Sequence, residues 1–243
     1  MASRSSRSAR PRGRREHRKR VTRRELLAAG RRLFGESGLY ESRIEDLSRL
    51  AGVAKGTLYG YFANKLDLIE AVVTDGFSEL LGHVHRHAQR SRSHVEVVTR
   101  VVEAHLRFFE ENPDLMRVFH QVRGLIKFDR PEGRPLRRVL ANYLAGLAHV
   151  LALHPRRARG QASHRDLATL LFGAVSGISS TRASVAAAVP RSLLSRATVR
   201  ALVALALAYE GRPAPGTRGS LAAARASRRV PGFTVRHRPR TVR

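Results

Sequence analysis

The chain has 243 residues, of which 46 are Lys or Arg and 19 are Asp or Glu, so its formal net charge is +27. This length predicts one or two domains, and a hydrophobic content of 42% is enough for a folded core. The sequence contains no Cys, which excludes disulfides, thiolate metal sites and cysteine nucleophiles. No run reaches the roughly 18 uncharged apolar residues of a membrane span. We therefore expect an intracellular protein with a polyanionic partner and no membrane association.

The positive charge is concentrated at the two ends of the chain. Residues 1–20 carry a net charge of +8, residues 212–243 contain nine Arg and no acid, and residues 21–211 contribute only +10. Both ends are rich in Arg and lack apolar periodicity. This composition predicts a disordered basic arm over residues 1–20 and a disordered basic tail over residues 212–243.

Capping signals open the first two predicted helices. Thr22 and Glu25 have the spacing of a capping box at the start of a helix, and Gly38 suits the left-handed position after it. Ser42 and Glu45 repeat the capping-box spacing and predict a second, short helix.

A third short helix is predicted over residues 54–61, after a turn at Gly52. Asn64, with Asp67 three residues later, is expected to cap a fourth helix that extends to about Arg90.

The rest of the chain also has helical periodicity. Proline residues are expected at helix boundaries because proline lacks the amide that a helix interior requires. No period-two alternation indicates a strand, so the predicted fold class is all-α. The five further helices are expected over residues 94–111, 113–122, 135–153, 164–189 and 193–210.

The three short helices of residues 21–64 are typical of a helix-turn-helix, in which the helix after the turn enters the major groove of DNA. The exposed face of the third helix offers hydroxyls for phosphate oxygens, and Lys55 as a point charge. Gly56 has no side chain and allows the backbone to approach base edges. Residues 21–64 have a net charge of only +2, and most of the excess charge lies in flexible ends that cannot read bases in a fixed register. We therefore assign specificity to residues 21–64 and non-specific attraction to the two ends.

The run AGVAKGTLYGYF over residues 51–62, followed by Asn64 and Lys65, resembles the DNA-binding signature of the tetracycline-repressor (TetR) family. The resemblance is specific between Thr22 and about Leu68. It implies a helix-turn-helix DNA-binding domain over residues 21–64.

The same resemblance implies a helical domain over residues 65–211 that binds a small-molecule effector and forms a homodimer. Two departures from the usual pattern are Ala54, where members often have Ser or Thr, and Gly60, where a contacting side chain is common.

The resemblance also implies which residues contact DNA. Lys55 and Gly56 are expected to approach bases, and the hydroxyl-bearing residues that follow them to reach phosphates or bases. For Tyr59, packing inside the domain remains an alternative. The full set of expected DNA contacts is Ser42, Arg43, Lys55, Gly56, Thr57, Tyr59, Tyr61 and Lys65.

Aromatic residues of the C-terminal domain are candidates for an apolar effector pocket, with ordinary core packing as the alternative for each. Neither a metal nor a cofactor is expected, because the lone histidines His105, His120 and His149 are more typical of packed or surface positions. The candidate pocket residues are Phe108, Phe119, Phe128, Tyr143 and Phe172.

The last two predicted helices carry small residues that allow close helix approach, and the resemblance implies that they form a four-helix dimer interface. An intramolecular core is the alternative. A dimer would place two recognition helices about 34–36 Å apart on a pseudo-palindrome.

These features predict a homodimeric transcriptional repressor that a small hydrophobic effector releases from a double-stranded DNA operator. We expect it in the bacterial cytoplasm, at the nucleoid. The alternative function is a non-specific basic protein that coats nucleic acid through its two ends. An enzyme is not expected, since the sequence has no glycine-rich phosphate loop, metal-ligand spacing or paired acid–base residues.

Overall fold

The computed structural model describes residues 12–127, 133–154, 162–184 and 195–210. No strand occurs in these ranges, which confirms the predicted all-α class. The first four helices are α1 (Arg12–Ser37), α2 (Ile44–Leu50), α3 (Lys55–Tyr59) and α4 (Lys65–Ala88). The others are α5 (His94–Glu111), α6 (Pro113–Lys127), α7 (Arg134–Leu151), α8 (His164–Ser184) and α9 (Arg196–Glu210).

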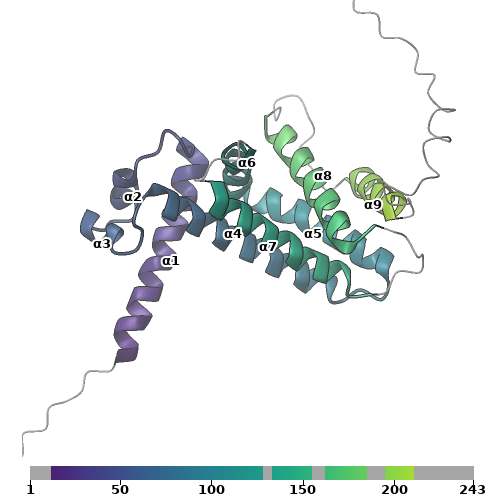
Figure 1. The fold of residues 1–243 in the computed structure, drawn as a ribbon, viewed down its shortest axis with the longest axis horizontal. Helices are drawn as coiled ribbons and strands as arrows, with labels where there is room; N and C mark the ends of the chain where they lie inside the picture. The colour runs from purple at the N-terminus through teal and green to yellow at the C-terminus, as the bar shows by residue number, and fades with distance from the viewer. Residues whose placement is uncertain (1–11, 128–132, 155–161, 185–194, 211–243) are drawn as a thin grey trace, which may run out of the picture.

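Helices α1 to α3 lie at one end of the molecule, and α8 and α9 lie toward the other (Figure 1). The core beneath α1 to α3 contains Phe34, Leu47, Leu58 and Phe62, all of which are almost completely buried. Burying such side chains contributes about 1.5–3 kcal/mol each. These short helices are therefore held by a shared core, since isolated helices of their length are marginal in water.

The first helix begins earlier than the sequence indicated. Helix α1 starts at Arg12, so residues 12–20 are helical where a disordered arm was expected, and Thr22 lies inside the helix instead of capping it. Arg, Lys and Glu are good helix formers, and here they continue a helix that the core already fixes farther along the chain. Residues 1–11 and the predicted tail over residues 212–243 lie outside the described residues.

Helix α4 connects the two ends of the molecule. Its predicted cap is confirmed: Asn64 Oδ1 accepts from the Asp67 amide at 3.0 Å, and Asp67 Oδ2 accepts from the Ala63 amide at 2.9 Å. Its buried face packs against α5 and α7. The cap and these packed faces therefore determine where α4 begins and how it is oriented.

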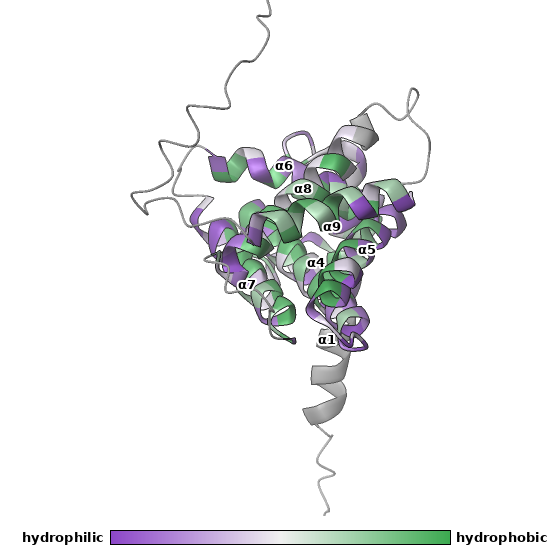
Figure 2. Cartoon of the chain, turned by 90° about the vertical axis from the view of Figure 1, so that its right-hand side faces the viewer, coloured by the Kyte–Doolittle hydropathy of each residue, from purple (hydrophilic) through white to green (hydrophobic). Residues whose placement is uncertain are grey.

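Helices α5 to α9 form the larger part of the core. Helix α5 is the most buried of them and packs against α4, α8 and α9. Helix α6 extends to Lys127, five residues past its predicted end, and includes Gly124. The predicted ends of the last two helices at residues 189 and 193 fall in a range that the structure does not describe. Figure 2 shows apolar residues on α8 and α9, which face the viewer there.

Candidate functional site

The turn between α2 and α3 has the geometry of a helix-turn-helix. Gly52 has a φ of +65°, a conformation that side chains other than glycine rarely adopt. The Val53 amide then donates to the carbonyl of Ser48 at 3.0 Å, which turns the chain back across α2. Gly38, at φ +82°, ends α1 in the same way. Both glycines have the role that the sequence predicted.

Helix α3 turns one side to the core and the other to solvent. Leu58 is its only buried residue, whereas Lys55, Gly56, Thr57 and Tyr59 are exposed. Tyr59 is 49% exposed, so the fold places it on the surface and not in the core. The structure therefore brings these four predicted DNA-contacting residues together on one open face.

Tyr61 lies after the end of α3 and is half-buried against the core, with its ring 6.4 Å from that of Phe62. The two departures from the family pattern flank the helix. Ala54 is the N-cap of α3 and supplies no side-chain hydrogen bond, and Gly60 is its C-cap. Helix α3 is therefore held at its ends by backbone hydrogen bonds alone.

Lys55 is the exposed cation of this face. Its Nζ lies 4.0 Å from Glu45 Oε1 on α2, and both side chains are largely open to water. An exposed pair of this kind contributes little to stability. The Lys55 ammonium can therefore leave Glu45 for a phosphate or a base at small cost.

The start of α2 differs from the predicted capping box by one residue. Arg43, not Ser42, is the N-cap, and its amide donates to Asp46 Oδ2 at 3.1 Å. The hydrogen bond from Arg49, together with the one from the Arg43 amide, lowers the pKa of Asp46. Ser42 is 3% exposed and its hydroxyl donates to the carbonyl of Leu39. The predicted phosphate-contacting hydroxyl of Ser42 is therefore inside the domain, while Arg43 is exposed.

Lys65 has a structural role that the sequence did not indicate. Its Nζ donates to the carbonyls of Tyr40, at 3.1 Å, and Ser42, at 2.5 Å. These bonds attach the start of α4 to the loop between α1 and α2. An ammonium has three donors, so one remains for the phosphate contact expected of Lys65. Both acceptors are backbone atoms, which leave no signal in a sequence.

Arg31 on α1 joins this domain to the rest of the molecule. Its guanidinium donates to Asp114 on α6 through two bonds of 2.7 and 3.1 Å, and to Asn112 and Glu79. Burial alone would raise the pKa of Asp114, but the hydrogen bonds and charge of Arg31 outweigh it and lower that pKa. Gln121, also on α6, accepts from the Leu39 amide at 2.6 Å. Helix α6 thus holds α1 and the loop that follows it.

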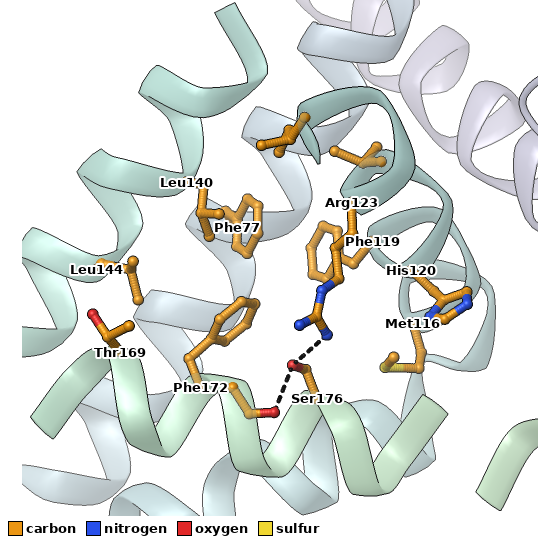
Figure 3. Close-up of a pocket in the computed structure, with 13 residues that line it drawn as sticks. Phe77, Met116, Phe119, His120, Arg123, Leu140, Leu144, Thr169, Phe172 and Ser176 are labelled. Carbon is orange, nitrogen blue, oxygen red and sulfur yellow. Dashed lines mark hydrogen bonds between the residues drawn. The ribbon is translucent and has the colours of Figure 1, made fainter. Parts of the chain in front are cut away.

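A separate cavity of about 170 Å³ lies between α4, α6, α7 and α8. Phe77, Phe119 and Phe172 come from three of these helices, and their rings face the same space (Figure 3). The Phe77 and Phe119 rings stack with their centroids 4.2 Å apart. Leu140 and Leu144 of α7 complete the apolar lining. The cavity can hold a small apolar group.

The predicted pocket residues divide into three groups. Phe119 and Phe172 line the cavity. Tyr143 lies behind the lining and stacks on Phe77 at 4.7 Å, whereas Phe108 packs elsewhere, near His83. Phe128 lies outside the described residues. The sequence missed Phe77 because its apolar spacing on α4 is also that of an ordinary core residue.

His105 and Tyr143 form a buried polar pair behind this cavity. The Nδ1 of His105 donates to the Val101 carbonyl at 2.7 Å, so its Nε2 accepts from the Tyr143 hydroxyl. Burial lowers the pKa of His105 to about 4 and raises the pKa of Tyr143 well above its usual value. Both side chains are therefore neutral at physiological pH, and His105 has a packing role.

The described part of the chain has neither a membrane-spanning helix nor a cluster of metal ligands. No helix there is long and apolar enough to cross a membrane. Among the same residues, no group of three or more His, Asp or Glu side chains is arranged to hold a metal ion.

The fold and the open face of α3 define an all-helical protein with a helix-turn-helix domain. Residues 26–72 match the family model described as bacterial regulatory proteins, tetR family. The match covers the helix-turn-helix domain and the first part of α4, so this region of the chain is similar to the regulators of that family.

Curated relatives match over the same region. The transcriptional regulator TtgR of Pseudomonas putida is 31% identical over 90 residues, which are 37% of this chain and 42% of TtgR. The probable regulator ArpR of Pseudomonas putida is 34% identical over 65 residues, 27% of this chain and 30% of ArpR. The chain thus matches less than half of the length of either relative. TtgR is a helix-turn-helix transcriptional regulator and ArpR a probable one.

Solved structures extend the likeness of the fold. FadR of Bacillus halodurans superposes with a TM-score of 0.65 at 18% identity, covering 76% of this chain and 97% of that one. FadR of Bacillus subtilis, solved in complex with stearoyl-CoA, superposes with a TM-score of 0.63 at 19% identity, covering 74% and 97%. The arrangement of the C-terminal helices is therefore that of known regulators.

Proposed function

We propose that this protein is a sequence-specific DNA-binding repressor that acts as a homodimer. A small hydrophobic effector would release it from a pseudo-palindromic operator. The observation that carries the proposal is the open face of α3, where Lys55, Thr57 and Tyr59 are exposed and a Cβ at Gly56 would meet nothing within 4 Å. Such a face can enter the major groove without displacing any core side chain. The protein would act in the cytoplasm, at the nucleoid.

The DNA contacts that we propose follow the exposure of each residue. Lys55 and Gly56 would approach base edges, and Thr57 and Tyr59 would donate to phosphates. Tyr61, near the end of the same face, would reach a phosphate through its hydroxyl. Arg43 and the remaining donor of Lys65 would position the backbone, while Ser42 would act indirectly by shaping the loop to which Lys65 binds.

The proposed dimer interface is the outer face of α8 and α9. Leu205 is 49% exposed, and Ala201, Ala204 and Ala208 on the same helix are also exposed. An apolar face of small side chains is typical of helices that pack closely against a partner. A two-fold axis through this face would give the two α3 helices the fixed separation that a palindromic site requires.

The effector would act through the two helices that line the cavity and also hold the DNA-binding domain. Helix α4 carries Phe77, which lines the cavity, and Lys65, which bonds to the loop between α1 and α2. Helix α6 carries Phe119, which lines the cavity, and Asp114, which accepts hydrogen bonds from Arg31 on α1. An effector releases DNA only if it binds the DNA-incompetent conformation more tightly. The stearoyl-CoA in the Bacillus subtilis FadR structure supports a ligand with an apolar body at a site of this fold.

The test is selection of bound sequences from random double-stranded DNA by the full chain. We expect a motif with two-fold symmetry, and Lys55→Ala should alter the preferred base at one symmetric position at a cost of about 1–3 kcal/mol. Arg90→Ala, at an exposed arginine beyond the end of α4, is the matched control and should leave the motif unchanged. No enriched motif would contradict the proposal and favour a non-specific coating protein.

A further inference from the structure

Among the described residues, Arg123 is the one arginine that lines the cavity, and its guanidinium reaches from α6 across to α8 (Figure 3). Its Nη1 donates to the hydroxyl of Ser176 at 3.3 Å. In the described part of the chain no carboxylate pairs with Arg123, whereas Arg49 and Arg100 each have one and Arg31 has two. Arg123 is an exposed residue, and its one protein partner at the cavity is a neutral hydroxyl at the end of a long hydrogen bond.

Apart from His120, Thr169 and Ser176, the rest of the cavity lining is apolar. Phe77, Phe119 and Phe172 surround the space into which the guanidinium points. His120, one turn earlier on α6, is bonded through Nδ1 to the Ser180 hydroxyl at 2.6 Å, so its ring is directed along the seam with α8. The cavity thus combines an aromatic wall with one cationic end.

An anionic oxygen group suits this cationic end better than any neutral group. Hydrogen bonds between a guanidinium and a carboxylate or phosphate are about twice as strong as neutral ones, and two can form side by side. A ligand with such a head would replace the weak bond to Ser176. A cationic ligand would be repelled by Arg123.

The size of the cavity limits the body of the ligand. Its volume of about 170 Å³ is close to that of an apolar cavity of about 150 Å³ that binds benzene. It is also below the roughly 300–1,000 Å³ of sites for drug-sized ligands. A single aromatic ring or a short alkyl chain therefore matches the space.

We propose that the effector is a small amphiphilic acid. Its anionic oxygen head would bind Arg123, and an apolar body of about one ring would lie against Phe77, Phe119 and Phe172. This inference rests on the proposed function only in naming the ligand an effector, since the binding site itself is defined by the cavity and Arg123.

The test is titration calorimetry of the full chain with four probes. Phenylacetate and phenyl phosphate carry the two possible heads, and phenylacetamide and hexanamide are neutral. We expect at least one acid to bind about tenfold or more tightly than phenylacetamide. Equal affinity of phenylacetate, phenyl phosphate and phenylacetamide, or no binding of any probe, would overturn the proposal. The tighter of the two acids identifies the head as carboxylate or phosphate.

Three variants test the assignment to Arg123. Arg123→Gln should abolish the preference for acid over amide, while Arg138→Gln, at an exposed arginine of α7 that does not line the cavity, should retain it. Ser176→Ala should retain or increase acid affinity, because it frees the guanidinium. If Arg123→Gln kept the preference for acid over amide, the assignment of the anion-binding role to Arg123 would be wrong.

A separate readout distinguishes this inference from the proposed function. Fluorescence anisotropy with the selected operator reports whether the bound acid releases DNA. Acid binding without release would leave the acid site intact and contradict only its role as an effector site. If the chain bound its operator but bound neither phenylacetate nor phenyl phosphate, the repressor proposal would stand and the acid site would be wrong.

Discussion

Arg31 on α1 and Asp114 at the start of α6 form a two-pronged ion pair, with Nε 2.7 Å from Oδ2 and Nη2 3.1 Å from Oδ1. The pair joins the DNA-binding domain to a helix that also lines the cavity. Both side chains are only partly exposed, at 22% and 29%. It is a direct polar connection between α1 and the helix that carries Phe119 and Arg123 at the cavity.

Asp114→Asn should therefore weaken this connection. We expect the free energy of unfolding to fall by about 1–2 kcal/mol, because the charge-assisted bonds of Arg31 to a carboxylate are lost from a partly buried site. Urea unfolding measures the change. Asp75→Asn removes the same charge from the same cleft at an exposed position and should change stability by less than about 0.5 kcal/mol. Equal effects of the two variants would contradict a specific role for Asp114.

Lys65→Ala should affect both DNA binding and the loop between α1 and α2. Loss of the proposed phosphate contact should weaken binding to every sequence and reduce the salt slope by about 0.9. Loss of the bonds to the Tyr40 and Ser42 carbonyls should also lower the thermal midpoint. Lys65→Arg is the matched variant and should retain most of the salt slope. A normal salt slope in Lys65→Ala would show that Lys65 acts only on the loop.

Leu205→Arg should prevent the proposed dimer. A charge placed in the apolar face of α9 would have to be buried without a partner, which is strongly unfavourable. Analytical ultracentrifugation should show a dimer for the unchanged chain and a monomer for the variant. Leu153→Arg alters an equally accessible leucine after the end of α7 and should remain dimeric. If Leu205→Arg stayed dimeric, the interface would have to lie elsewhere.

Stability should decrease in mild acid because of His105. Burial holds the pKa of His105 at about 4, below its ordinary value of 6.5, so the unfolded chain binds a proton more readily. The contribution is fully present above about pH 6.5 and is lost progressively as the pH falls toward 4, reaching roughly 3 kcal/mol. Urea unfolding at several pH values measures this slope.

Two variants show which histidine causes the loss of stability in acid. Burial, and secondly the charge of His87, also lowers the pKa of His83 below its ordinary value. His105→Gln should remove most of the acid sensitivity, and His83→Gln a smaller part, since His83 is less buried than His105. An unchanged slope in His105→Gln would contradict the assignment.

Much of the fold could be predicted because its signals are local. The positive φ of Gly38 and Gly52 and the cap between Asn64 and Asp67 each depend on residues a few positions apart. The start of α1 could not be predicted in this way. Residues 12–20 have no apolar pattern of their own and extend a helix that is anchored farther along the chain.

The candidate DNA-binding face was equally accessible to sequence analysis. Lys55, Gly56, Thr57 and Tyr59 lie within five residues on one short helix, so helical spacing alone places them together. Ser42 shows the limit of this reasoning. A hydroxyl at the start of a helix is typically exposed, but here the preceding loop folds over it and buries it.

The all-helical class and the helix-turn-helix could be predicted from the amino-acid sequence, and its charge led us to expect a polyanionic partner. These follow from composition and from spacing within single helices. Only the tertiary structure decided that Phe77 joins the cavity, that Arg123 is its cationic end and that Arg31 meets Asp114 across 83 positions. The physical reason is that each such contact depends on how two or more helices pack, and helix packing is set by the whole buried core rather than by any local run of residues.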